Sequence, residues 1–133
     1  MKRCPAISRV VMVLFFLVAG LNHFRTPDVY LSMMPPWLPC PRELNFIAGI
    51  AEIMGALGML IPARAIRGAA GWWLIALLIA VFPANLHVAM NGWPGVNIHI
   101  WLLWLRLPFQ VLLIVWVYNC CLRNVRTQTC WRL

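Results

Sequence analysis

Four apolar stretches constrain this chain more than any other feature of its sequence. They cover residues 7–24, 44–61, 69–90 and 98–121. A helix needs about 20 residues to cross a hydrocarbon layer about 30 Å thick, so each stretch has the length of one crossing. The stretches take up most of the 133 residues, of which 63% are hydrophobic and 11% charged. We therefore predict a single all-α domain over residues 1–133, a bundle of four antiparallel transmembrane helices.

Basic residues are distributed unevenly between the segments that flank the four stretches. Four crossings place three of these segments on one side, and they hold Lys2, Arg3, Arg9, Arg64, Arg67, Arg123, Arg126 and Arg132. On the opposite side, Arg25 and Arg42 are offset by Asp28 and Glu43. The positive side of a membrane protein faces the cytoplasm, so both termini are predicted to be cytoplasmic. Anionic lipid headgroups explain the net charge of +8 without a nucleic acid partner.

The first stretch has an alternative interpretation as a cleaved signal peptide, because a basic start precedes an apolar run that ends in VAG. However, the run continues into LNHFRTP, whose polar residues match the depth of polar residues in the other stretches. Cleavage would also leave three spans with a different orientation. We therefore keep the prediction of four spans.

The five cysteines form no C-x-x-C motif, which argues against thiol-disulfide chemistry. Cys40 is predicted to lie outside, and Cys4 and Cys130 inside. Cys120 and Cys121 lie near the membrane, where they are candidates for palmitoylation. Free cytosolic thiols are the interpretation we prefer, and whether these two residues are modified stays open.

The segment between the first two stretches, RTPDVYLSMMPPWLPCPRE, is unlike a flexible linker. Its prolines stiffen the chain, and Met33, Met34, Trp37 and Leu38 make it apolar. We expect this proline-rich outer loop to lie on the bundle as a lid.

The second stretch carries one acidic residue, Glu52, on a face with the small residues Ala48, Ala51, Gly55 and Gly58. Small residues let helix backbones approach closely in lipid, so this face is expected to contact protein.

Glu52 and Arg106 are predicted to lie at the same depth. Each follows the outer start of its stretch by eight residues, which is about 12 Å at a rise of 1.5 Å per residue. An unpaired charge there costs roughly 2.5–3.5 kcal/mol on insertion scales, so we expect the two to pair. A guanidinium and a carboxylate are able to form two parallel hydrogen bonds. The pair has two interpretations, a structural ion pair that fixes helix order or part of a binding site.

Other polar residues gather in the same outer half. Asn22 and His23 end the first stretch, Asn85 lies in the third, and His99, Arg106 and Gln110 share one face of the fourth. The inner half is nearly free of polar residues, which favours a pocket that opens outward over a pore. The predicted ligand-binding or buried polar set is His23, Glu52, Asn85, Arg106 and Gln110, with no catalytic residue and no metal ligand.

Several prolines, histidines and tryptophans, and Asn85 of this set, also have structural interpretations. Pro83 and Pro108 are predicted to free the carbonyls of Ile79 and Trp104, and Asn85 is a candidate to cap the first of these. His87 is interpreted as an interfacial residue, and His23, His87 and His99 lack the spacing of a metal site. The tryptophans interpreted as interface anchors are Trp72, Trp73, Trp93 and Trp101.

Several segments together resemble the DoxX-like family of small four-helix membrane proteins. They are GLNHFRTP, MMPPWLPCPREL, AGIAEIMGALGMLIP, IALLIAVFPANLHVAM and WLRLPFQ, in that order, and the resemblance covers residues 20–117. The residues that match the family pattern are His23, Pro35, Pro39, Glu52, Pro83, Asn85, Arg106, Pro108 and Gln110. The resemblance implies a four-helix bundle in the bacterial inner membrane and an association with membrane oxidoreductases. The tail after Tyr118 lies outside it.

The leading functional hypothesis is a non-catalytic subunit or accessory protein of a membrane oxidoreductase system, with a quinone-like or lipid-like ligand in the outer half of the bundle. Quinone is the candidate cofactor. The expected partners are the lipid bilayer and a membrane oxidoreductase, and whether the chain also forms a homo-oligomer stays open. The alternative is an assembly factor for membrane proteins that acts by helix packing. Enzymatic activity stays undecided, because no catalytic or redox motif accompanies the polar set.

Overall fold

A computed structural model describes residues 5–122, and every regular element in that range is helical. The elements are α1 (Ala6–Arg25), α2 (Pro27–Leu31), α3 (Pro41–Leu60), α4 (Arg64–Asn91), α5 (Ile100–Val117) and the π-helical turn η1 (Tyr118–Leu122). The helices α1, α3, α4 and α5 with η1 are long and apolar enough to cross a membrane. This confirms the predicted all-α fold with four candidate spans. Predictions made for Lys2, Arg3, Cys4, Arg123, Arg126, Cys130 and Arg132 fall outside the described residues.

Two helices, α3 and α4, begin three and five residues earlier than the apolar stretches predict. α3 begins at Pro41 rather than Leu44, because proline lacks the N–H that a first helical residue leaves unpaired in any case. α4 begins at Arg64 rather than Ala69, because arginine is a good helix former although it is not apolar. Pro83 lies inside α4 without ending it.

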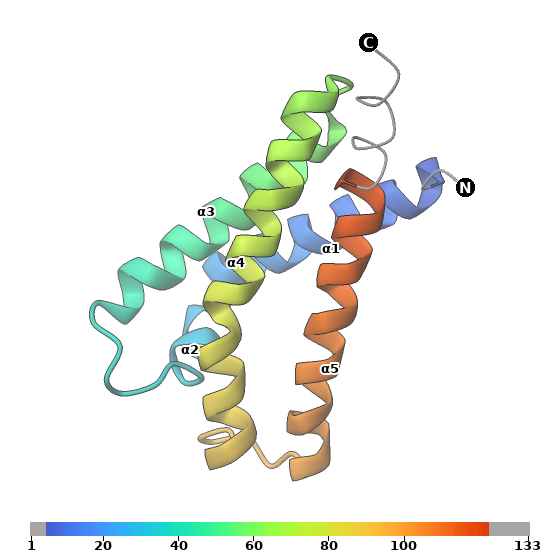
Figure 1. Cartoon of the computed structure of the whole chain (residues 1–133). Coiled ribbons are helices and arrows are strands. Elements are labelled where there is room, and N and C mark those ends of the chain that lie inside the picture. Colours follow the sequence, from blue (N-terminus) through green and yellow to red (C-terminus); the bar gives the residue numbers. More distant parts are fainter. Residues whose placement is uncertain (1–4, 123–133) are drawn as a thin grey trace.

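The long helices pack in chain order. α1 packs against α3, α3 against α4, and α4 against both α5 and η1. Figure 1 shows α4 and α5 side by side and antiparallel, joined by the loop that follows Asn91. The start of α1 meets the end of α5, where Trp116 Nε1 donates to Ser8 Oγ at 2.8 Å. We call this the η1 end of the bundle and the opposite one the α2 end.

The outer surface of the bundle is apolar. At most 33% of the residues in each candidate span are buried. The side chains that face outward include Ile7, Trp72, Met90 and Leu112, each more than half exposed. Such extensive apolar exposure suits lipid rather than water as the surrounding medium.

Glycines set the distance between neighbouring helices. A methyl group added at Gly55 of α3 would lie 2.5 Å from Leu74 Cδ2 of α4, and one at Gly58 would lie 2.8 Å from Ala70 Cβ. Between α1 and α3, a methyl group at Gly49 would lie 2.8 Å from His23 Cβ. The small-residue face of α3 therefore contacts protein, as the sequence predicts.

Two apolar clusters fill the described interior. The larger one, toward the η1 end, is centred on Phe16, Met59 and Leu74, all essentially inaccessible. The smaller one, at the α2 end, contains Met33 and Leu103. Polar side chains of the interior lie where the two clusters meet.

The segment between α1 and α3 packs partly on the bundle. It contains the short helix α2, which the sequence analysis did not anticipate. Met33 is buried in the smaller cluster, whereas Trp37 is 68% exposed. Trp93, from the loop between α4 and α5, donates from Nε1 to Ser32 Oγ at 2.9 Å. Trp93 is thus a structural contact of this segment rather than an interface anchor alone.

Both cysteines at the η1 end are buried. Cys120 is 6% and Cys121 1% exposed, and a methyl group at Gly71 would lie 2.6 Å from Cys121 Cβ. Cys121 is a free thiol, whereas Cys120 is disulfide-bonded, which corrects the expectation of a free thiol at that position. Neither side chain is open to the acylation considered above.

Candidate functional site

A cavity of about 290 Å³ lies between the long helices, close to the α2 end. Its wall contains all members of the predicted polar set: His23, Glu52, Asn85, Arg106 and Gln110. The rest of the wall is mostly apolar or aromatic, with Phe15, Phe109 and Leu78 among its residues. A mainly apolar hollow with a few convergent polar groups is the usual form of a small-molecule site.

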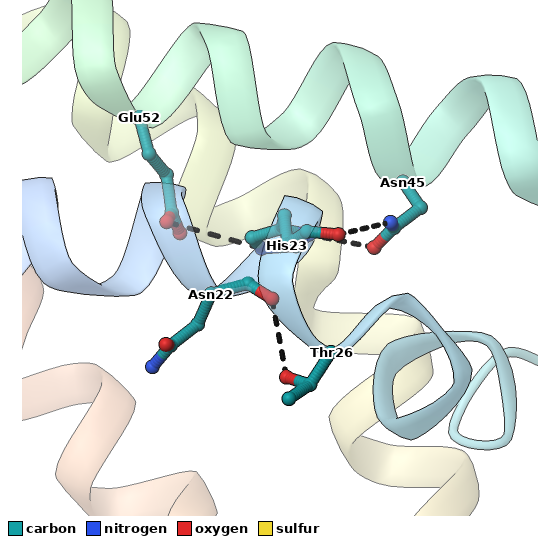
Figure 2. Close-up of polar contacts among 5 residues, drawn as sticks. All are labelled: Asn22, His23, Thr26, Asn45 and Glu52. Atoms are coloured by element: carbon teal, nitrogen blue, oxygen red, sulfur yellow. Dashed lines mark hydrogen bonds and ion pairs between the residues drawn. The ribbon is translucent and has the colours of Figure 1, made fainter.

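His23, in the last turn of α1, is held by Asn45 in the first turns of α3. His23 Nδ1 lies 2.7 Å from Asn45 Oδ1, and Asn45 Nδ2 donates to the His23 carbonyl oxygen at 2.9 Å. Both residues are buried, at 7% and 4% exposure. Figure 2 shows the two contacts side by side, with the amide of the adjacent Asn22 turned away from them.

This pair of contacts fixes the protonation of His23 Nδ1. A backbone carbonyl only accepts hydrogen bonds, so the NH₂ group of Asn45 must face the His23 carbonyl and Oδ1 must face the ring. Since Oδ1 also only accepts, His23 Nδ1 carries a proton and donates it. The neutral ring therefore presents an unprotonated Nε2.

Glu52, in the middle of α3, faces that Nε2. The distance from Glu52 Oε2 to His23 Nε2 is 3.8 Å, which is within ion-pair range but too long for a hydrogen bond. Oε2 is buried and has no hydrogen-bond partner. Figure 2 shows the carboxylate approaching His23 from the opposite side to Asn45.

The predicted ion pair between Glu52 and Arg106 is not formed. Both residues line the cavity, but within residues 5–122 the ion-pair partner of Glu52 is His23. Arg106 donates to Met33 Sδ at 3.3 Å, and its Cζ lies 4.8 Å from the ring centroid of Trp93. Their equal depth in the bundle thus predicted that Glu52 and Arg106 line the same cavity, but not which residues they contact. Glu52 faces His23, and Arg106 contacts Met33 and Trp93.

Gln110 joins α5 to α4. Its Nε2 donates to the Leu78 carbonyl, and its Oε1 accepts from Asn85 Nδ2 at 3.1 Å. The prediction that Asn85 caps a freed carbonyl is wrong, since Asn85 donates to Gln110 and it is Gln110 that reaches the α4 backbone. The carbonyl that Gln110 reaches belongs to Leu78 rather than to Ile79, whose carbonyl Pro83 was predicted to free.

Tyr30 of α2 covers His23. The two rings are stacked, with centroids 3.8 Å apart and planes inclined by 25°. Burial raises the pKa of the Tyr30 phenol, the negative charge of Glu52 raises this pKa further, and Arg106 opposes both effects. The phenol therefore stays neutral and able to donate a hydrogen bond beside the cavity.

The two remaining histidines lie outside the cavity wall. His87 contacts Asn91 on the same helix, with Asn91 Nδ2 3.1 Å from His87 Nδ1. His99 precedes α5 as its N-cap residue. Across residues 5–122, no three His, Cys, Asp or Glu side chains are grouped so that they could hold a metal ion.

Sequence reasoning missed several residues of the site, namely Tyr30, Met33, Asn45 and Trp93. For Asn45 a signal was available, because it precedes Glu52 by seven residues and therefore lies on the same face of a helix. The others come from α2 and the connecting loops. Helical spacing does not predict where such segments fold back.

These features define an all-helical bundle with four helices long and apolar enough to cross a membrane, built around a mainly apolar cavity to which each of these helices adds at least one polar side chain. The chain belongs to the family described as a domain of unknown function, DUF8561, which matches residues 12–121. The match includes every residue of the cavity wall named above. No curated protein and no solved structure matches the chain. Nothing in these comparisons links it to the DoxX-like family.

Proposed function

We propose that this chain is a non-catalytic, multi-pass protein of the bacterial inner membrane, related to the DoxX-like proteins, that binds a quinone-like or lipid-like molecule in its cavity. In this proposal it serves as a subunit or accessory protein of a membrane oxidoreductase. Both termini lie in the cytoplasm, and the segment containing α2 covers the cavity from the outer side. The uneven distribution of basic residues supports this orientation.

One observation carries the proposal: Glu52 and Arg106 share an apolar-walled cavity without bonding to each other. Intramembrane charges are costly, and those that are not neutralised by one another are usually functional. Arg106 has five N–H donors, of which one reaches Met33 Sδ, so donors remain for a carbonyl oxygen of a ligand. The apolar wall suits the ring or chain of such a ligand.

A binding measurement tests the proposal. Purified protein in lipid nanodiscs is titrated with a short-chain ubiquinone analogue, and binding is followed by quenching of tryptophan fluorescence. We expect saturable binding that weakens about tenfold in Arg106→Gln, the loss of one charge-assisted hydrogen bond. Arg25→Gln is the matched control, because Arg25 lies at the end of α1 outside the cavity wall. Binding that does not saturate, or that weakens equally in both variants, would refute the proposal.

The assembly-factor alternative is supported by the apolar exterior alone. Its other motive, the small-residue face of α3, is occupied within the chain by Leu74 and Ala70 of α4. Crosslinking in native membranes separates the two functions. A reproducible protein partner together with an empty cavity favours assembly, and a copurifying amphipathic molecule favours binding.

A further inference from the structure

The carboxylate of Glu52 and the ring of His23 face each other without a hydrogen bond between them. Glu52 Oε2 and His23 Nε2 are 3.8 Å apart, and both residues line the cavity. An oxygen atom that bridged them would lie about 2.8 Å from each, which is the length of a good hydrogen bond. Two bonds of this length and the 3.8 Å separation form an ordinary triangle. Oε2 has no other hydrogen-bond partner in the described chain, although it is buried.

The chemistry of the two atoms determines what kind of oxygen fits. Asn45 holds the proton of His23 on Nδ1, so Nε2 is either bare or, in the charged ring, a donor. When Nε2 is bare and Glu52 is protonated, the bridging oxygen accepts from Oε2–H and must donate to Nε2. When the proton has moved, the bridging oxygen accepts from Nε2–H and must donate to the carboxylate. Both arrangements contain the same number of protons, and both need an oxygen that donates and accepts.

A hydroxyl group meets this requirement, whereas a carbonyl or an ether oxygen only accepts. We propose that the edge of the cavity formed by His23 and Glu52 is a recognition site for a hydroxyl group of an amphipathic ligand. This inference rests on the cavity of the proposed function and narrows its ligand to a hydroxyl-bearing molecule, such as a phenol or a reduced quinone. Asn45 acts as a positioning residue, because it determines which nitrogen of His23 faces the ligand.

Hydrogen bonds of the described chain leave Glu52 Oε2 without a partner. Tyr30 of α2 stacks on the face of the His23 ring. From α5, Arg106 is directed to Met33 and Trp93. The part of the wall that α4 supplies contains the neutral amide of Asn85, which is bonded to Gln110. Glu52 Oε2 is therefore free to bond to the hydroxyl, and Arg106 lies in the wall of the same cavity.

The test compares 4-octylphenol with 4-octylanisole, two redox-inert probes that differ by replacement of the hydroxyl proton with a methyl group. Affinities are measured for the wild-type protein in nanodiscs, for Glu52→Met and for Glu43→Gln. Both probes partition into lipid, so the quantity compared is the ratio of the phenol affinity to the anisole affinity for each protein. The effect of partitioning on this ratio is the same in every protein and cancels when the proteins are compared. Glu43 is the matched acidic control, because it lies on the same helix outside the cavity wall.

We expect the ratio of phenol to anisole affinity to be about tenfold higher in the wild type and in Glu43→Gln than in Glu52→Met. A tenfold change is about the effect of one hydrogen bond to a charged group. An equal ratio in all three proteins would overturn the inference. Because no quinone is involved, the outcome is separate from that of the ubiquinone titration: a retained phenol preference without quinone binding would refute the proposed function alone.

A second measurement does not need a ligand. Nitrogen NMR of labelled His23 is expected to show a protonated Nδ1 in the wild type and a mixture of tautomers in Asn45→Leu. A wild-type ring with its neutral proton on Nε2 would overturn the part of the inference that makes Asn45 a positioning residue, because Asn45 would then not hold the proton on Nδ1. Asn22→Leu serves as the control, since its amide points away from the pair.

Discussion

The guanidinium of Arg106 lies over the indole ring of Trp93, with Cζ 4.8 Å from the ring centroid. The electron-rich face of the indole attracts the cation, and Met33 Sδ accepts one of its hydrogen bonds at 3.3 Å. Trp93 belongs to the loop between α4 and α5, and Met33 follows α2. One charged side chain of α5 therefore ties both connecting segments to the α2 end of the bundle.

Substituting Trp93 with leucine should destabilise the protein. The change removes the contact with Arg106 and the hydrogen bond from Nε1 to Ser32 Oγ, which together contribute about 2–3 kcal/mol when they are shielded from water. The free energy of unfolding in mixed detergent micelles measures the effect. Trp101→Leu is the control, because Trp101 is 61% exposed on the outside of α5. Equal losses in both variants would show that Trp93 acts as an interface anchor alone.

The bond between His23 and Asn45 should also matter for stability. Asn45→Leu leaves the His23 carbonyl and its Nδ1–H buried without partners, which costs about 2 kcal/mol or more. Asn22→Leu makes the same chemical change one residue before His23, where the amide faces away from the pair, and should cost less than about 0.5 kcal/mol. Thermal unfolding followed by circular dichroism compares the two. If Asn22→Leu is as destabilising as Asn45→Leu, the hydrogen bonds between His23 and Asn45 do not contribute specifically to stability.

The contact between α3 and α4 gives a prediction about packing. Gly55→Ala places a methyl group 2.5 Å from Leu74 Cδ2, so the Leu74 side chain or the helix that carries it must shift, at a cost of about 1–3 kcal/mol. Leu74→Ala is also destabilising, because Leu74 is fully buried. In the double variant the added methyl group occupies part of the space that leucine vacates. We expect the double variant to be more stable than the sum of the single effects by about 1 kcal/mol or more. Strict additivity would contradict the close approach.

The span positions and the composition of the cavity wall were predictable for a common reason. Lipid and apolar side chains are nearly equivalent environments, so a long apolar run states where a helix crosses, and a polar residue within it must face protein. Equal depth from the start of each run then placed Glu52 and Arg106 beside the same cavity. These inferences need only the rise per residue and the cost of burying a charge.

Partners within the cavity were not predictable in the same way. Which atom bonds to which depends on displacements of a few ångströms and on segments without helical periodicity. Tyr30 and Met33 belong to such a segment. Tyr30 covers His23, and Met33 accepts a hydrogen bond from Arg106. No spacing or composition in the sequence predicts that the hydrogen-bond partner of Arg106 is Met33, at 3.3 Å, rather than Glu52.

The phenol of Tyr30 gives a pH-dependent prediction. Burial, with the Glu52 charge, raises its pKa above the usual 10.0 in the folded protein. The unfolded state therefore loses this proton at a lower pH than the folded state does. The contribution of Tyr30 to stability is fully present below pH 10.0 and is lost as the pH rises through the folded pKa. Above pH 10.0, stability should fall more steeply in the wild type than in Tyr30→Phe.

Tyrosinate absorbance tests this directly. The chain has two tyrosines, so the wild-type titration minus that of Tyr30→Phe isolates Tyr30. We expect the midpoint of the difference to lie above 10.0, and to move down in Glu52→Met, which removes the negative charge that adds to the shift. Glu43→Gln, with its charge lost on an exposed part of α3, should leave the midpoint unchanged. A midpoint at or below 10.0 would mean that Tyr30 is open to water and does not cover His23 as described.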